Sequence, residues 1–183
     1  MAGQDRYEVI LAGAGGQGLV LAGMVLGEAA ILEGKNVVQT VSYGIASRGG
    51  FSQAEVIIDR AEIIFQQVEK PDIVLAMTKE AFALHRDLAS AGSRIFYDST
   101  LLPHQEGPGL LGHPYTRTAA DLGHSAGANI VALGTIAAAT GLVRVESLVQ
   151  AVNGRFAPAA AAVNIAALHA GAGLIAAGGR CEG

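Results

Sequence analysis

The sequence YEVILAGAGGQGLVLAGMVL at residues 7–26 is the part of this 183-residue chain that indicates its class of fold most directly. Residues 7–12 form a short apolar run that ends in a cluster of glycines, which is typical of a buried strand entering a tight turn. A helix is expected over residues 16–33, with apolar side chains nearly all the way round it. Gly34 follows the last turn, where helices favour glycine. A buried strand, a glycine loop and a helix in this order begin an α/β sheet.

Strands and helices continue to alternate along the chain. Strands are predicted at residues 36–42, 51–59, 73–78, 94–98 and 115–118, and helices at 79–91, 119–122, 128–140, 145–153 and 158–177. The strand at 51–59 is the one that could run antiparallel, and the proline- and glycine-rich stretch 101–114 is predicted to be a loop. We therefore expect one domain over residues 1–183, with a mostly parallel, Rossmann-like sheet flanked by helices and a helical C-terminal region.

The composition excludes several classes of protein. Hydrophobic residues make up 51% of the chain and charged residues 15%, so the chain can bury a sizeable core. The net charge of −4 argues against nucleic acid as a partner. The single cysteine, Cys181, can hold neither an iron–sulfur cluster nor a structural zinc, which fits a cytoplasmic protein without a metal of its own. So few charges also predict surfaces that partner chains cover, and self-association of the isolated chain.

Two long stretches, residues 122–143 and 156–179, contain no Asp, Glu, Lys or Arg. Both are rich in alanine and glycine and are interrupted by histidine and asparagine, which insert poorly into lipid. We interpret them as buried helices of a soluble protein, and the polar residues 1–8 lack the apolar core of a signal peptide.

The glycine cluster GAGGQG at residues 13–18 matches the pattern G-x-G-x-x-G between a strand and a helix. Glycines let the backbone approach an anionic group, and the N–H groups at a helix start can bind it. The alternative is that these glycines only make a tight turn and allow close packing. A dinucleotide site also needs an acidic residue after the second strand, and residues 34–54 contain none, so NAD is disfavoured.

The segment SYGIASRGGFS at residues 42–52 places Arg48 before Gly49 and Gly50. A guanidinium on such a turn can bind a phosphate or a carboxylate through two hydrogen bonds. The alternative is a solvated hairpin loop. Because one helix joins the first two strands, a right-handed crossover is expected to place them side by side, with this loop and the glycine loop at the same carboxyl edge of the sheet.

Other polar residues favour structural roles. The sequence GHSAG at residues 123–127 matches a nucleophile elbow, but no strand is expected before it, so we predict a turn between helices. Asp98 at a strand end could bind substrate, but it is more simply a turn and capping residue. Asn129 and Asn164 sit in apolar helices and must find partners, at an interface or as tethers of a loop. The five histidines show no metal-binding spacing, and no acid–base pair supports independent catalysis.

Five segments together resemble the gamma subunits of 2-oxoacid:ferredoxin oxidoreductases, most of all the 2-oxoglutarate:ferredoxin oxidoreductase (2-oxoglutarate synthase) type. They are GAGGQGLVLAG (13–23), QTVSYGIASRGGFSQAEVII (39–58), KPDIVLAMT (70–78), YTRTAADLG (115–123) and ANIVALGTIAAATGLV (128–143). The likeness covers nearly the whole chain in order. Where the family usually has SYGPEARGG, this chain has Ile45, Ala46 and Ser47 in place of Pro, Glu and Ala. Relatives that act on pyruvate, branched-chain oxoacids or indolepyruvate share this subunit type.

The resemblance implies a subunit that is inactive alone and has no catalytic residue. The holoenzyme converts a 2-oxoacid and coenzyme A to acyl-CoA and carbon dioxide and passes two electrons to ferredoxin. Thiamine diphosphate and the iron–sulfur clusters belong to partners: alpha and beta subunits, and a delta or ferredoxin-like subunit where one is present. This chain would help to receive coenzyme A. Its candidate binding residues are Gly13, Gly15, Gly16, Gln17, Gly18, Ser42, Tyr43, Arg48, Gly49 and Gly50. The competing hypothesis is an independent NADP-dependent reductase in which Arg48 binds the ribose phosphate.

Overall fold

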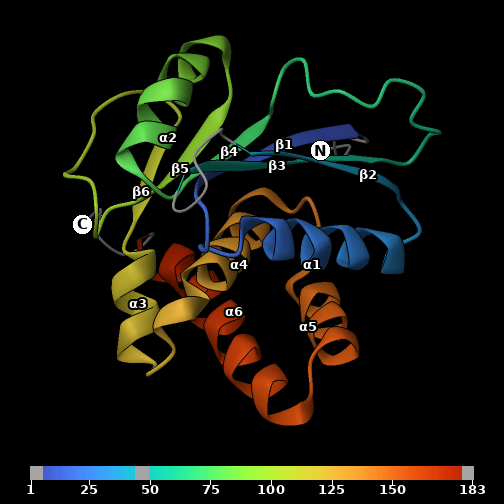
Figure 1. Cartoon of the computed structure of the whole chain (residues 1–183), viewed down its shortest axis with the longest axis vertical. Coiled ribbons are helices and arrows are strands. Elements are labelled where there is room, and N and C mark those ends of the chain that lie inside the picture. The colour runs from blue at the N-terminus through green and yellow to red at the C-terminus, as the bar shows by residue number, and fades with distance from the viewer. Residues whose placement is uncertain (1–5, 44–49, 179–183) are drawn as a thin grey trace.

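A six-stranded sheet separates two layers of helices in the computed structural model, which describes residues 6–43 and 50–178 (Figure 1). The strands are β1 (Arg6–Ala14), β2 (Asn36–Tyr43), β3 (Phe51–Asp59), β4 (Ile73–Ala76), β5 (Arg94–Asp98) and β6 (Leu110–His113). The helices are α1 (Leu19–Leu32), α2 (Lys79–His85), α3 (Tyr115–Asp121), α4 (Ala128–Thr140), α5 (Val145–Arg155) and α6 (Pro158–Gly178), with short 3₁₀ turns η1 (Arg86–Ala91) and η2 (Ser125–Gly127). The α/β class, the glycine-led first helix and the helical C-terminal region are confirmed.

The strand order is β2-β3-β1-β4-β5-β6, and only β3 runs against the others. The prediction of a mostly parallel sheet with an antiparallel third strand is confirmed. The prediction that the first two strands lie side by side is wrong. After β2 the chain returns as β3, which pairs with β2 along its length and with β1 from Arg6↔Asp59 to Ala14↔Phe51. Because β3 reverses direction between them, β1 and β2 still end at the same edge of the sheet.

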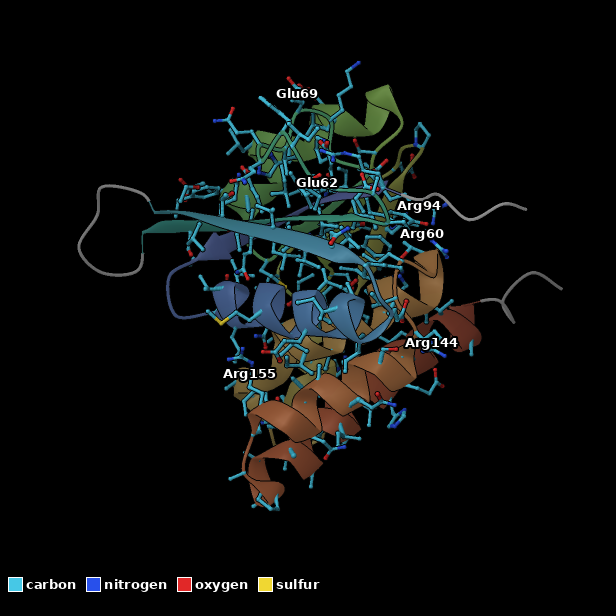
Figure 2. The ribbon with its side chains drawn as sticks, turned by 90° about the vertical axis from the view of Figure 1, so that its right-hand side faces the viewer. Arg60, Glu62, Glu69, Arg94, Arg144 and Arg155 are labelled. Carbon is cyan, nitrogen blue, oxygen red and sulfur yellow. The ribbon has the colours of Figure 1, made fainter. Side chains whose placement is uncertain are left out.

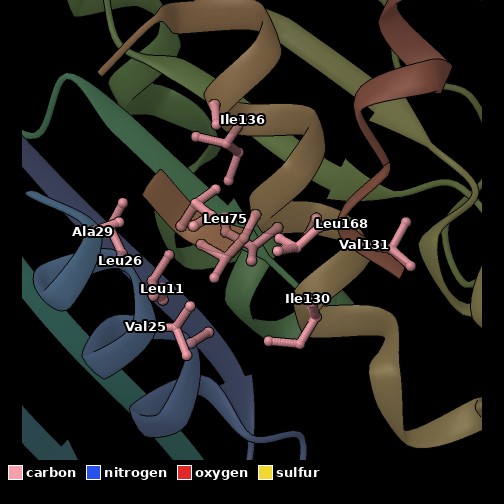
Figure 3. Packing of buried hydrophobic residues seen from close by; sticks show 14 of the residues in the cluster. Leu11, Val25, Leu26, Ala29, Leu75, Ile130, Val131, Ile136 and Leu168 are labelled. Atoms are coloured by element: carbon pink, nitrogen blue, oxygen red, sulfur yellow. The ribbon is translucent and has the colours of Figure 1, made fainter. Parts of the chain in front are cut away.

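Both faces of the central strands are buried, and β1 shows why. Val9 and Leu11 face the larger core under α1 and α4, whereas Ile10 and Ala12 face the smaller core under α2. Successive side chains of a strand point to opposite faces, so a strand covered on both sides must be apolar throughout. Figure 3 shows the larger core, in which Leu11 and Leu75 of the sheet lie among side chains of α1, α4 and α6.

The segment predicted to be a loop, residues 101–114, contains the edge strand β6, and the predicted strand at 115–118 is the start of helix α3. Asp98 explains the second difference. This fully buried carboxylate accepts hydrogen bonds from the Thr116 N–H (3.1 Å) and the Thr116 hydroxyl, and from the Thr100 N–H (2.9 Å). It thus accepts a hydrogen bond from an N–H group in the first turn of α3. Because Asp98 is 18 positions earlier in the chain, the local sequence at residues 115–118 does not reveal this contact. Its role as a turn and capping residue is confirmed.

Several boundaries differ by a few residues. Helix α1 begins at Leu19 rather than at residue 16, and the helix predicted at 79–91 is α2 followed by the 3₁₀ turn η1. The turn predicted at residues 123–127 is confirmed, since α3 precedes it and no strand does.

Helices α4 and α6 cross with almost no side chain between them. A Cβ atom added at Gly134 would lie 2.1 Å from the Leu168 carbonyl oxygen, and one at Gly171 would lie 1.9 Å from that of Val131. The Thr135 hydroxyl also donates to the Gly171 carbonyl (2.9 Å). The alanine- and glycine-rich composition therefore allows backbone-to-backbone packing of the helical layer.

The prediction that both uncharged stretches are buried helices holds for α4 and for only one face of α6. Over Pro158–Ala176 this helix has the length and apolar composition of a membrane span, and 28% of that window is buried. Its outward face is mainly alanine and includes the exposed Val163. Figure 2 shows charged side chains elsewhere. Glu62 and Glu69 lie across the sheet from α1, and Arg155, the last residue of α5 in the helical layer, pairs with Glu28 of α1.

We expect the buried His85 and the half-buried His113 to make the fold sensitive to mild acid. Desolvation lowers the pKa of His85, with Glu55 partly opposing it, and desolvation also lowers the pKa of His113. Between the pKa of an unfolded histidine, about 6.5, and the lower value in the fold, only the unfolded chain takes up the proton. The free energy of unfolding should therefore fall as the pH drops from 7 to 5.5, above the range in which carboxylates titrate. Urea unfolding across this range should show a shallower slope for His85→Gln and an unchanged slope for the exposed His169→Gln. Equal slopes in all three proteins would contradict the prediction.

Candidate functional site

The glycine loop joins β1 to α1 at the carboxyl edge of the sheet. Gly16 (φ 94°) and Gly18 (φ 70°) have left-handed backbone conformations that side chains disfavour. Gly18 is also the N-cap of α1 and provides no side-chain cap. The first N–H groups of α1, from Leu19 onward, have no partner within the helix and open toward the loop. The loop thus places the first N–H groups of α1 at the carboxyl edge of the sheet.

Gln17 holds the loop on the sheet. Its Oε1 accepts the Ala14 N–H (2.8 Å) and its Nε2 donates to the Met77 carbonyl (3.2 Å), so one amide joins the ends of β1 and β4. Gly13 makes room for this amide, because a Cβ atom there would lie 2.3 Å from Gln17 Oε1. Gly13 is buried within β1 and therefore has a packing role. Gly15 and Gly16 are the exposed residues of the loop.

The two predicted binding segments meet at this edge. The Gly15 N–H donates to the Gly50 carbonyl (2.8 Å), and Tyr43 at the end of β2 pairs with Ser52 of β3. Ser42 is exposed on the same edge strand. Arg48 and Gly49 lie outside the described residues, and Tyr43 is described in its backbone only. The Gly50 end of the second segment is thus bonded to the glycine loop, whereas Ser42 and Tyr43 lie one strand further away, on β2.

Asn129, near the start of α4, contacts the glycine loop from the helical layer. Its Nδ2 donates to the Gly18 carbonyl (2.8 Å), and its Oδ1 accepts the Ile130 N–H (2.9 Å). The prediction that Asn129 tethers a loop is confirmed. Asn164 is also a tether: its Nδ2 donates to the Ala160 carbonyl within α6, and its Oδ1 lies 3.3 Å from His124 Nε2 in the turn before α4.

A shallow groove of about 440 Å³ runs along the loop and the first turns of α1. Its walls contain no charged side chain; they are formed by Ala14, Gly15, Gly16, Gly18, Leu19, Val20, Leu21, Met24 and Ser52. Sequence reasoning missed Ser52 and the outward side chains of α1. The signal in the sequence was that apolar residues continue nearly all the way round this helix. In the structure one of them, Met24, is exposed because no other part of the described chain covers it.

The sheet order bears on the alternative of a dinucleotide site. In the doubly wound nucleotide-binding folds, the ribose is bound at the end of the strand next to the first one. Here that neighbour is β3, which begins at this edge with Phe51 and Ser52, and the end of β2 lies two strand spacings, about 10 Å, from β1. Neither position offers an acidic side chain at this edge.

Comparison with known proteins defines the class. The family model described as pyruvate ferredoxin/flavodoxin oxidoreductase matches residues 8–174, which include the whole sheet apart from the first two residues of β1. The chain therefore belongs to the pyruvate ferredoxin/flavodoxin oxidoreductase family.

Within this family the chain is similar to 2-oxoglutarate synthase subunits KorC. It is 39% identical to the subunit of Methanothermobacter marburgensis over 93% of this chain and 97% of that one. It is 40% identical to the subunit of Archaeoglobus fulgidus over 79% and 78%. Relatives named for ketoisovalerate also match, at 33% identity for subunit VorA of Methanothermobacter thermautotrophicus, in which the match covers 32% of the length.

Solved structures share the fold. The gamma subunit of a keto/oxoacid ferredoxin oxidoreductase from Geobacter sulfurreducens superposes with a TM-score of 0.81 at 36% identity, over 93% of this chain and 99% of that one. A longer chain of the 2-oxoglutarate:ferredoxin oxidoreductase from Magnetococcus marinus contains the same fold, with a TM-score of 0.84 at 21% identity over 95% of this chain and 32% of that one. In some relatives this domain is therefore part of a larger polypeptide.

Proposed function

We propose that this chain is the gamma subunit of a cytoplasmic 2-oxoglutarate:ferredoxin oxidoreductase. The reaction converts 2-oxoglutarate and coenzyme A to succinyl-CoA and carbon dioxide, and two electrons reduce ferredoxin. The observation that carries the proposal is the similarity to KorC subunits from the first strand to the last helix. Alpha and beta subunits, and a ferredoxin-like subunit where present, would supply thiamine diphosphate and the clusters.

We further propose that the glycine loop contributes to the binding of coenzyme A. Coenzyme A has phosphate groups and a long, mostly uncharged arm. The N–H groups at the start of α1 suit a phosphate, and the uncharged groove along Val20 and Met24 suits the arm. Charge complementarity would come from Arg48 or from a partner, because the groove has no cation of its own among the described residues that line it.

The alternative, an independent NADP-dependent reductase, lacks comparable support. The position next to β1 is taken by an antiparallel strand, and neither β2 nor β3 offers an acidic side chain at the described edge. Saturable binding of NADPH to the isolated chain, measured by calorimetry, would favour the alternative.

Assembly is the decisive test of the proposed function. Co-expressed with its alpha and beta partners, this chain should co-purify with them, and the complex should reduce ferredoxin only when 2-oxoglutarate and coenzyme A are both present.

The isolated chain should show no turnover with a dye acceptor and no iron–sulfur absorption, and should self-associate through surfaces such as the uncharged outer face of α6. Turnover by this chain alone, or a complex that forms without it and is fully active, would refute the assignment.

A further inference from the structure

Asn129 is 111 residues away from Gly18 in the chain, yet its side-chain amide is the polar group that holds the start of α1 in place. Gly18 has no side chain with which to cap the helix, and its carbonyl already accepts the Ala22 N–H (2.9 Å). The second acceptor position of that carbonyl is filled by Asn129 Nδ2 at 2.8 Å. Asn129 is 3% exposed, so water does not readily replace its amide.

The orientation of the amide is determined by its two bonds. Asn129 Oδ1 faces the Ile130 N–H, so the amino group must face the Gly18 carbonyl. A carboxylate of the same shape would place an oxygen against that carbonyl and remove the donor. The contact is also close: a Cβ atom at Gly18 would lie 2.6 Å from Asn129 Nδ2. The last glycine of the loop is therefore needed for the approach of Asn129 as well as for its own left-handed conformation.

We propose that Asn129 is a positioning residue for coenzyme A: through the Gly18 carbonyl it sets the peptide orientation of the glycine loop and of the first N–H groups of α1. This inference rests on the proposed function, in which that loop meets coenzyme A. Asn129 itself does not line the groove. Its effect should therefore be on the affinity for coenzyme A, without a change in the chemical step or in the affinity for the 2-oxoacid.

The experiment compares Asn129→Asp and Asn129→Ala with Asn164→Asp in the assembled complex. Asn164 is a matched control because it is a buried asparagine in the same helical layer, bonds within α6 and to His124, and does not touch the glycine loop. Both Asn129 variants should raise the KM for coenzyme A by about tenfold, because the loop would be in its binding-competent orientation for a smaller fraction of the time, and should leave kcat and the KM for the 2-oxoacid unchanged. Amide exchange in the peptide containing Gly18 and Ala22 should be at least about fivefold faster in these two variants. The control, Asn164→Asp, should change neither the KM for coenzyme A nor the amide exchange of this peptide.

Arg48→Ala, measured in parallel, separates the two hypotheses. Two results would refute the role of Asn129 but leave the proposed role of the glycine loop intact. One is unchanged amide exchange in the Asn129 variants. The other is faster amide exchange with an unchanged KM for coenzyme A, while Arg48→Ala raises that KM. If neither Asn129 variant nor Arg48→Ala changes the KM for coenzyme A, the proposed role of the glycine loop fails and the inference fails with it. Asn129→Ala introduces no charge, so it keeps the test valid if the aspartate variant does not assemble.

Discussion

Replacing Gly171 by alanine is expected to lower the free energy of unfolding by about 3 kcal/mol or more, whereas the same change at Gly173 should raise it slightly. Both residues are in α6, two positions apart. A methyl group at Gly171 would lie 1.9 Å from the Val131 carbonyl oxygen and 2.8 Å from its carbon, so helices α4 and α6 would have to separate. At Gly173 nothing lies within 4 Å of the added atom.

The opposite sign at Gly173 follows from helix propensity, since alanine is favoured over glycine by about 1 kcal/mol in an exposed helix. Urea unfolding of the purified subunit measures both changes. A second close contact gives an independent check, because a Cβ atom at Gly134 would lie 2.1 Å from the Leu168 carbonyl oxygen, and Gly134→Ala should be as damaging as Gly171→Ala. Two variants at Gly171 and Gly173 of equal stability would show that α4 and α6 are not in backbone contact.

Arg48→Ala should raise the KM for coenzyme A of the assembled enzyme by roughly ten- to a hundredfold, since a hydrogen bond to a charged group is worth about 1.5–3 kcal/mol. The structure places the end of this segment at the glycine loop, because the carbonyl of Gly50, two residues after Arg48, accepts a hydrogen bond from the Gly15 N–H. Assembly and the KM for the 2-oxoacid should change little, because the proposed contact is with a phosphate of coenzyme A.

A matched control is Arg94→Ala, which removes the same charge from the first residue of β5, at the opposite edge of the sheet, where Arg94 donates to the Ala139 carbonyl. Steady-state kinetics with varied coenzyme A compare the two variants. An unaltered KM in an intact Arg48→Ala complex would exclude the phosphate contact. Loss of co-purification would instead identify Arg48 as an interface residue.

Around the glycine loop, the elements that depend on residues adjacent in the chain could be predicted from the sequence. The run of apolar residues, the glycines and the helix that follows predict β1, the loop and α1 in order, because a strand and a helix are each recognised by a short period of apolar side chains. The direction of β3 and the turn at 123–127 were predicted on the same kind of local evidence. The family resemblance rests on these same segments.

Other features depend on contacts between distant residues. Residues 115–118 form a helix because Asp98 binds Thr116. Strand β6 was not predicted because it lies in a proline- and glycine-rich stretch. Its Gly112 makes room for the ring of Tyr97, which would lie 2.4 Å from a Cβ atom at that position. The insertion of β3 between β1 and β2 also escaped prediction, since the crossover rule assumes that strands joined by a helix become neighbours.

The class of fold, the glycine loop and its edge of the sheet could be read from neighbouring residues in the chain, because they follow from local periodicity and from the conformational freedom of glycine. The partner of each polar group depends instead on how distant segments pack together. The amide of Gln17 joins the ends of β1 and β4; Asn129 had to find a partner, and that partner is Gly18. A buried amide must be satisfied, but the chain that satisfies it is brought close only when the helices pack on the sheet.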